Sequence, residues 1–133
     1  MTHFPTPTLD GDGAPFWLAL RAGRLDVQAC GACGTLRHPP SPVCSACRST
    51  AVTWTTVSGR AEVWSHTTVH PPTLPAFADE TPYHAYVVRL IEGPFLVVRA
   101  VREIDVLLPV GTPVEVIAEA VADDVVLAAI RPA

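Results

Sequence analysis

The stretch CGACGTLRHPPSPVCSAC, residues 30–47, holds all four cysteines of the chain, as two Cys-x-x-Cys pairs with ten residues between the inner cysteines. Each pair places two thiolates on one tight turn, and two facing turns supply four sulfurs at the ~2.3 Å distance that zinc prefers. Gly31 and Gly34 let the first turn curl so that its N–H groups point at sulfur. The second turn has Ser45 and Arg48 there, so the sequence determines its geometry less well. The spacing predicts a zinc site whose ligands are Cys30, Cys33, Cys44 and Cys47.

A zinc ion with four thiolate ligands has no open position for water or substrate. We therefore expect the site to stabilise the fold and not to activate a nucleophile. A redox-active dithiol or an iron centre is the alternative for the same four residues. His38 lies between the two pairs, but a complete set of cysteines makes it unnecessary as a ligand. We interpret His38 as a solvated loop residue or as a hydrogen-bond donor beside the site.

The length of 133 residues suits one ordinary core, or one small core plus a metal-stapled module. With 49% hydrophobic and 17% charged residues the composition is globular, and no apolar run reaches the ~18 residues of a membrane span. The first residues, MTHFPTPTLDGDG, lack the basic and apolar regions of a secretory signal, so we expect a cytoplasmic protein. In a reducing compartment, paired cysteines favour metal over disulfide.

Residues 14–23, APFWLALRAG, predict one short helix with Phe16, Trp17 and Leu20 on one stripe and Gly23 just past its end. Residues 24–30, RLDVQAC, alternate apolar and polar side chains and predict a strand. Six β-rich segments follow: TWTTVSG, RAEVWSHTTVH, YHAYVVRLIEG, PFLVVRAVRE, PVEVIAEAV and DVVLAAI. The fold class is therefore mainly β, with an OB-like or related barrel of five to six strands; a sandwich is the competing architecture.

The order of the motifs PFW, GRLDVQAC, CGACG, PVCSAC, SGRAEVWSHTTVH, PY, GPFL, VGTPVEV and IRPA resembles the zinc-ribbon plus OB-fold proteins of the DUF35 family over about residues 15–133. The resemblance implies a rubredoxin-like zinc ribbon and a C-terminal OB-fold barrel. We divide the chain into a flexible tail (1–13), a helix with the zinc ribbon (14–53) and an OB-fold domain (54–133).

The same resemblance implies a non-catalytic accessory subunit that binds a thiolase-fold partner in a hetero-oligomer. That partner would be a thiolase or a lipid-transfer-protein-like aldolase acting on acyl-CoA, as in steroid side-chain degradation. The accessory subunit would help to form the acyl-CoA site of its partner.

A catalytic set is not visible, because the sequence has no G-x-S-x-G, no H-E-x-x-H and no glycine-rich phosphate loop. Strict alternation would place His66 and His70 on one strand face with Glu62, Trp64 and Thr68. The two histidines would then be roughly 13 Å apart, too far to chelate one ion. Both are best interpreted as exposed polar residues, and Asp79 and Glu80 as a solvated loop tip.

Two arginines stand out as candidates for a coenzyme A phosphate. Arg89 and Arg99 fall on the two strands that the EGP turn joins. Arg102 follows Arg99 in the second of these segments, and Arg60 begins the segment RAEVWSHTTVH. Converging guanidinium groups hold phosphate bidentately or pair with an acidic partner surface. Ordinary surface arginines are the alternative.

The segment HPPTLPAFADETPY, residues 70–83, is too long for a plain strand connection and carries Leu74 and Phe77 near its middle. It either covers the barrel of its own chain or docks beside the acyl-CoA entrance of a partner.

Two other functions compete with the accessory subunit. A single-stranded nucleic-acid-binding OB-fold module would need exposed aromatic residues on one barrel face, for which Trp64, Tyr83 and Tyr86 are the candidates. The formal net charge of −4 and the absence of lysine oppose it. An independent enzyme acting on an acyl-CoA through His66 or His84 is the third hypothesis.

Overall fold

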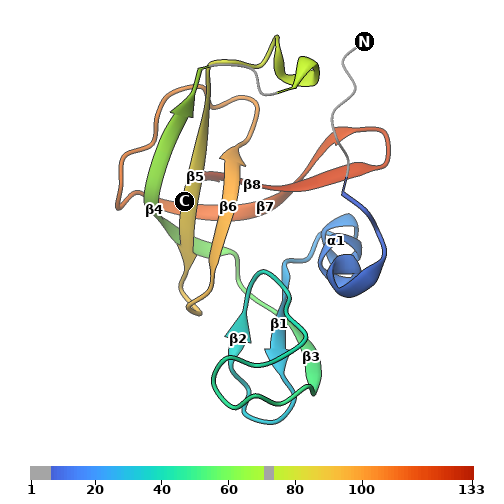
Figure 1. Cartoon of the computed structure of the whole chain (residues 1–133). Coiled ribbons are helices and arrows are strands. Elements are labelled where there is room, and N and C mark those ends of the chain that lie inside the picture. Colours follow the sequence, from blue (N-terminus) through green and yellow to red (C-terminus); the bar gives the residue numbers. More distant parts are fainter. Residues whose placement is uncertain (1–6, 71–73) are drawn as a thin grey trace.

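The computed structural model describes residues 7–70 and 74–133 and shows a small three-stranded sheet, a closed barrel and one α-helix beside them (Figure 1). The elements follow the order η1 (Gly11–Gly13), α1 (Ala14–Arg21), β1 (Asp26–Cys30), β2 (Leu36–Arg37), β3 (Val52–Thr56), β4 (Arg60–Val69), η2 (Pro75–Phe77), β5 (Tyr83–Leu90), β6 (Phe95–Ala100), β7 (Pro113–Ala122) and β8 (Val125–Pro132).

The predicted helix is confirmed as α1. Pro15 lies in its first turn, where the missing N–H costs no intrahelical bond, and Gly23 follows its end with φ +81°, a conformation that side chains disfavour. Phe16 and Leu20 are buried, and Trp17 packs partly buried against the same core. A single helix of eight residues is marginal alone, so this packing stabilises it.

The small sheet has the order β2-β1-β3, with β1 antiparallel to both neighbours. The first of the six predicted β-rich segments is β3, and it pairs with β1, for example Gln28 with Trp54, and not with the barrel. Strand β3 therefore completes the three-stranded sheet that carries the two cysteine turns, and we call this unit, residues 26–56, the cysteine module. This strand also crosses the boundary that we drew between residues 53 and 54.

The remaining five strands form a closed barrel of order β4-β5-β6-β8-β7, which confirms the mainly β, OB-like architecture. All of its pairings are antiparallel except the short parallel one between β6 and β8, which covers Arg99 with Ala129 and Ala100 with Ile130. One cluster of buried side chains connects the three parts of the chain, and it includes Leu20, Val27, Val88 and Ile130. The orientation of the cysteine module relative to the barrel is therefore fixed by packing.

A β-bulge at Trp64 changes which side chains share a face of β4. The pairing with β5 shifts between Val63 and Ser65, so Trp64 has no direct partner. Before the bulge Val63 pairs with the buried Val88, and after it His66 pairs with the buried Tyr86. An extra residue inverts the alternation, so Glu62 and Trp64 lie on the outer face while His66 and Thr68 lie on the inner one. The prediction that His66 shares one face of the strand with Glu62 and Trp64 is wrong for this reason.

Within the described residues, no helix is both long enough and apolar enough to cross a membrane. The cytoplasmic location stays a prediction. Residues 1–6 of the predicted flexible tail, and residues 71–73 of the long loop, lie outside the described residues. Pro7 and Leu9 line a small hollow with Trp17 and Val126.

Candidate metal centre and adjoining cleft

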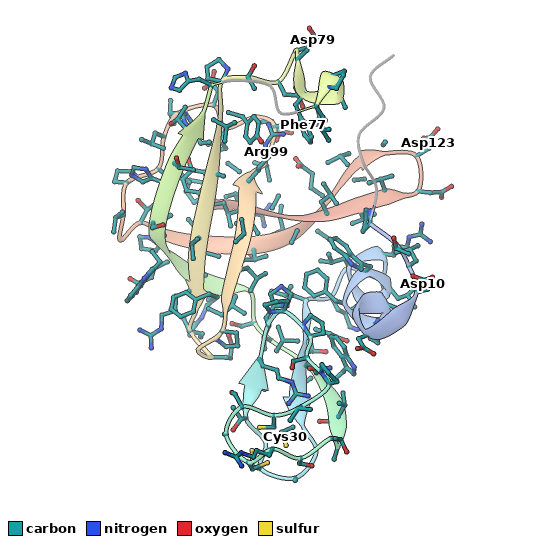
Figure 2. The ribbon with its side chains drawn as sticks, viewed as in Figure 1. Asp10, Cys30, Phe77, Asp79, Arg99 and Asp123 are labelled. Carbon is teal, nitrogen blue, oxygen red and sulfur yellow. The ribbon has the colours of Figure 1, made fainter. Side chains whose placement is uncertain are left out.

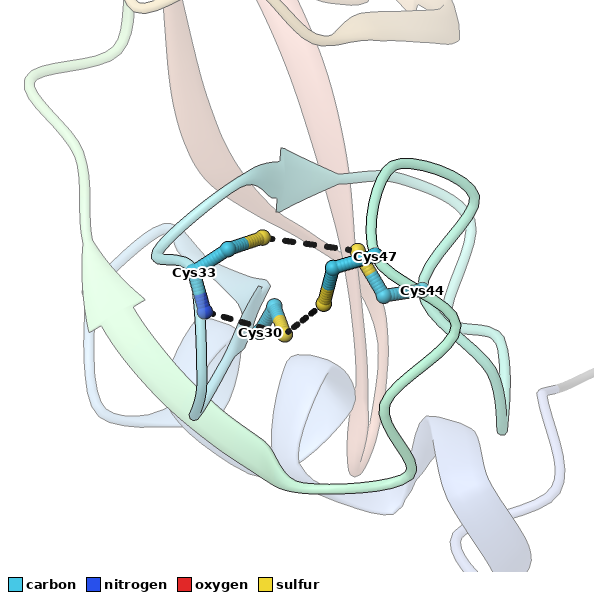
Figure 3. Close-up of side chains that lie close together, drawn as sticks. All are labelled: Cys30, Cys33, Cys44 and Cys47. Carbon is cyan, nitrogen blue, oxygen red and sulfur yellow. Dashed lines mark hydrogen bonds between the residues drawn. The ribbon is translucent and has the colours of Figure 1, made fainter.

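The four cysteine sulfurs form one compact group, with every pair within 4.8 Å (Figure 3). The Sγ atoms of Cys30 and Cys47 are 3.5 Å apart, and those of Cys33 and Cys44 are 3.6 Å apart. Four sulfurs at ~2.3 Å from a tetrahedral zinc would be separated by about 3.8 Å. The sulfurs thus fit zinc with little rearrangement, and the four thiolates would fill its coordination.

The two cysteine turns have the same backbone design. The N–H of Gly34 donates to the carbonyl of Cys30 over 2.9 Å, and the N–H of Arg48 donates to the carbonyl of Cys44 over 2.8 Å. Gly34 has φ +80° and Arg48 has φ +64°. The second turn therefore adopts the geometry of the first although it lacks glycine at this position.

Backbone N–H groups prepare two of the thiols for metal binding. The N–H groups of Cys33 and Ala32 point at the Cys30 sulfur, each over 3.4 Å, and lower the pKa of that thiol to about 6. The N–H groups of Cys47 and Ala46 likewise lower the pKa of Cys44. Zinc binds the thiolate form, so these N–H groups favour metal binding at Cys30 and Cys44. At Cys47 a backbone hydrogen bond from Ser49 acts in the same direction, but the hydrogen bonds among the neighbouring thiols outweigh it and raise the pKa to about 12. The four cysteines are arranged for structural zinc.

Gln28 holds the loop between the cysteine turns, although strand alternation predicts it on the polar face of β1. Its side chain is 3% exposed. The Oε1 atom accepts hydrogen bonds from the N–H of Ser41, over 2.7 Å, and from Nε of Arg37. The guanidinium of Arg37 also donates to the Ser41 carbonyl over 2.8 Å. A buried amide that accepts hydrogen bonds from a loop leaves no periodic pattern in the sequence. Alternation along the strand therefore could not predict that Gln28 is buried.

His38 is neither a ligand nor a solvated residue. Its ring packs 4.8 Å from the ring of Phe16, and its Nδ1 is buried with no hydrogen-bond partner among the described residues. Burial lowers its pKa because the imidazolium form loses hydration. The loop therefore uses His38 to pack the cysteine module against α1.

A cleft of about 720 Å³ opens between α1, the loop after β2 and the barrel. Its size falls in the range of small-molecule sites, and its walls are mainly apolar. The principal apolar walls come from Phe16, Trp17, Phe77, Val97 and Leu127. Phe77 and Arg99 both line it, and Figure 2 shows them at the end of the barrel away from Cys30. The described part of the long loop thus covers the barrel of its own chain.

Arg99 and Arg102 line one end of the cleft and share one carboxylate. The Oε1 atom of Glu80 lies 3.7 Å from Nη1 of Arg99 and 3.7 Å from Nη2 of Arg102. The Arg99 guanidinium also stacks 4.6 Å from the ring centroid of Tyr83. Glu80 is therefore held by partners, which corrects its interpretation as part of a solvated loop tip. Nothing in the sequence distinguishes Glu80 from its neighbour Asp79 in this respect.

Arg89 lies elsewhere on the outer face. It pairs in register with Phe95, four residues before Arg99 on β6, a separation of about 13 Å along the strand. Its guanidinium stacks 5.5 Å from the Trp64 ring. The structure therefore does not bring Arg89 and Arg99 together on one phosphate, and it places Arg102 beside Arg99 instead.

The outer strip, defined as Trp64, Phe95 and Val97, is an exposed apolar surface on β4 and β6. Trp64 and Phe95 contact each other edge to face with centroids 5.5 Å apart. Val97 is 78% exposed, and Trp64 and Phe95 remain 49% and 42% exposed. A cluster of exposed apolar side chains on a sheet is typical of an interaction surface.

The candidate aromatic face for nucleic acid is not formed. Tyr86 is 1% exposed, and its hydroxyl oxygen accepts a hydrogen bond from the N–H of Leu108 over 3.0 Å. The expectation of an exposed Tyr86 is wrong because this residue faces the barrel interior. Trp64 is on the opposite face.

The histidines proposed for an independent enzyme surround Tyr86. The ring of His66 lies 6.5 Å from the Tyr86 ring and that of His84 lies 6.4 Å from it, while Nδ1 of His84 is 2.9 Å from the Thr68 hydroxyl. Across the described ranges, the only group of three or more potential metal ligands is the four cysteines. His66 and His70 are exposed, which confirms their interpretation as exposed polar residues, and His84 is half-buried. No third ligand joins them in the part of the chain that the structure describes.

Known protein families match both the zinc-ribbon part and the barrel part of the chain. The family model of the ChsH2 rubredoxin-like zinc ribbon domain matches residues 17–53, and that of the ChsH2 C-terminal OB-fold domain matches residues 54–118. A chain of the solved Ltp2-ChsH2(DUF35) aldolase superposes with a TM-score of 0.82 and 35% identity, covering 95% of this chain and 98% of that one. A DUF35 protein of unknown function from Sulfolobus solfataricus has a TM-score of 0.57 at 17% identity and shares the fold.

Two curated relatives carry hydratase names. A probable enoyl-CoA hydratase alpha subunit of Thermomonospora curvata is 40% identical over 112 residues, which cover 83% of this chain and 34% of that protein. The 3-oxo-4,17-pregnadiene-20-carboxyl-CoA hydratase alpha subunit of Mycobacterium tuberculosis is 34% identical over 87 residues, 65% of this chain and 27% of that one. The chain thus spans about a third of the length of these relatives. With its ChsH2-type zinc ribbon and OB-fold, it belongs to the DUF35 family.

Proposed function

We propose that the chain is a non-catalytic accessory subunit of a thiolase-fold aldolase that acts on an acyl-CoA, and that it helps to form the acyl-CoA site of this partner. The observation that carries the proposal is the match to a chain of the Ltp2-ChsH2(DUF35) aldolase, which covers 98% of that chain at a TM-score of 0.82. The name of the Mycobacterium tuberculosis relative supports a steroid-type acyl-CoA as the substrate class.

The chemistry of the described residues supports a non-catalytic role. Four thiolates around zinc leave no position for a reacting group. His66 and His84 lie against Tyr86, whose hydroxyl accepts a hydrogen bond from the barrel backbone. A nucleophile with a base and an oxyanion donor, which an acyl-transfer site needs, is not brought together by these side chains.

The outer strip is the surface that we assign to the partner. Its three side chains expose apolar area beside the cleft, since Phe95 and Val97 belong to both. Burial of large apolar side chains supplies the central energy of most interfaces. In this arrangement Arg99 lies near the interface and would face a phosphate of the acyl-CoA, while Arg89 would meet a different part of the partner or ligand.

The test is co-expression with a thiolase-fold aldolase from the same source, followed by affinity purification through a tag on the aldolase. We expect the two chains to co-purify, and Val97→Asp to weaken the complex by about tenfold because it places a charge in the interface centre. Val106→Asp is the matched control, because Val106 is 64% exposed but lies outside the outer strip. A wild-type chain that never co-purifies, or equal effects of both substitutions, contradicts the proposal.

A further inference from the structure

Glu80 occupies a place between two guanidinium groups that an external anion would fit. Both Arg99 and Arg102 approach the same oxygen, Oε1, at 3.7 Å. Hydrogen-bonded arginine–carboxylate pairs have N···O distances of ~2.7–2.9 Å. The carboxylate is thus attracted by both cations while it takes up the short, bidentate geometry of neither.

The charges at this end of the cleft cancel only while Glu80 is present. Glu119 also lines the cleft, and its carboxylate accepts a hydrogen bond from the backbone N–H of Arg102 over 3.0 Å. Two arginines and two glutamates give no net charge. Displacement of Glu80 leaves a positive end on an otherwise apolar cleft, which complements an anionic group.

Glu80 is tied to the segment that covers the cleft. The N–H of Glu80 donates to the carbonyl of Phe77 over 3.0 Å, and Phe77 lines the cleft with its ring 6.0 Å from that of Tyr83. Tyr83 in turn carries the Arg99 guanidinium on its face at 4.6 Å. A change at the Glu80 carboxylate therefore acts on the contacts that hold residues 74–82 against the barrel.

We propose that Arg99 and Arg102 form a binding pair for a phosphate or pyrophosphate group, that Glu80 is its internal occupant, and that the incoming anion displaces Glu80 and loosens residues 74–82. The inference rests on the proposed function in naming acyl-CoA as the phosphate source. Two guanidinium groups match the several oxygens of a phosphate better than the one oxygen of Glu80 that they share. Partly exposed ion pairs contribute little to stability. A doubly charged phosphate group therefore replaces the Glu80 carboxylate beside Arg99 and Arg102.

The coupling between the anion and Glu80 must be reciprocal. In wild type, displacement of the Glu80 carboxylate costs free energy and weakens anion binding. A neutral side chain at position 80 removes that cost, so the anion binds more tightly. Glu80→Gln keeps the shape of the side chain and removes its charge, so it should bind anions more tightly and hold residues 74–82 less firmly.

The experiment uses the full zinc-loaded chain alone, with inorganic pyrophosphate as the probe at constant ionic strength and with metal analysis afterwards. Calorimetry should show pyrophosphate binding about threefold or more tighter in Glu80→Gln than in wild type, and about tenfold weaker in Arg99→Gln. Chymotrypsin cleavage after Phe77, identified by mass, should accelerate several-fold when pyrophosphate is added to wild type. Cleavage in Glu80→Gln should already be fast without it.

The matched control is Glu115→Gln, which removes an ion pair with Arg131 at 3.1 Å outside the cleft lining and should change neither measurement. Coenzyme A is the second arm: tighter binding than pyrophosphate assigns the site to a cofactor phosphate, and equal binding assigns it to free phosphate. Equal pyrophosphate affinity in wild type and Glu80→Gln, or cleavage that responds only as it does to chloride, overturns the inference. Because no partner is present, these results are independent of whether the chain co-purifies with an aldolase.

Discussion

Arg48 holds the same backbone position in the second cysteine turn that Gly34 holds in the first. Both residues have positive φ, +64° and +80°, and both donate their N–H to the carbonyl of the first cysteine of their own turn. The second turn therefore adopts this conformation although its residue at that position has a Cβ, which disfavours a positive φ. A residue with a Cβ in the left-handed region carries a cost of roughly 1–2 kcal/mol.

Arg48→Gly should stabilise the zinc-loaded protein by about 0.5–1 kcal/mol, because the relief of backbone strain exceeds the greater unfolded-state entropy of glycine. Urea unfolding with zinc present is the measurement. Arg48→Ala is its control, since alanine removes the side chain but keeps the Cβ. A similar gain in the alanine variant would show that the effect comes from the lost guanidinium and not from the backbone.

Removal of the metal should unfold the cysteine module. One zinc per chain is expected by metal analysis, and a strong chelator should change the fluorescence of Trp54, which lies on β3 and pairs with β1. Without the ion, the four thiol groups contact one another only through weak sulfur contacts. Iron in place of zinc, or an unchanged fold after chelation, contradicts a structural zinc site.

Gly59 is the glycine whose replacement should cost most in the barrel. A Cβ at this position would lie 2.7 Å from the carbonyl oxygen of Val116, and φ is +85°. Gly111 is its matched control, with φ +91° and nothing within 4 Å of the point where a Cβ would lie. Gly111→Ala should destabilise by about 1–2 kcal/mol and Gly59→Ala by about 1–3 kcal/mol more, since only the latter adds a backbone clash. Equal losses in urea unfolding would remove the close-approach explanation.

His38 should make stability sensitive to mild acid. Burial lowers its pKa below the usual 6.5, so the unfolded chain takes up a proton before the folded one does. The contribution is complete above the ordinary pKa and is lost as the pH falls from about 7.5 toward 5.5. His38→Phe keeps a ring against Phe16 and has no titrating group, so its stability should fall less over this range.

Unfolding at several pH values compares the two proteins, and both contain the same four cysteines, so acid loss of zinc affects them equally. Parallel pH curves for wild type and His38→Phe would show that His38 does not titrate between the folded and unfolded states.

Local patterns were sufficient for the helix, the cysteine ligands and the β-rich second half. Phe16 and Leu20 recur at helical spacing, and the cysteine spacing defines a metal site without knowledge of the fold. The assignment of β3 failed because a strand pattern does not say which sheet a strand joins. Alternation failed along β4 because the bulge at Trp64 adds one residue to the count, and nothing in the local composition marks it.

The candidate binding residues were harder to predict, because their grouping depends on tertiary contacts. Arg89 and Arg99 fall on neighbouring strands, yet register separates them along the sheet. Arg102 lies only three residues after Arg99, but Glu80 reaches both arginines from a separate loop, and its position in the sequence does not predict this contact. The same holds for Gln28, whose polar character suggested solvent although its amide anchors a buried loop.

The most direct test of the accessory role is turnover of an acyl-CoA substrate by three preparations: the thiolase-fold aldolase alone, this chain alone, and the two purified together. The proposed function predicts carbon–carbon cleavage by the complex, little or none by the aldolase alone, and none by this chain. Turnover by this chain alone, or an aldolase equally active without it, would contradict the account.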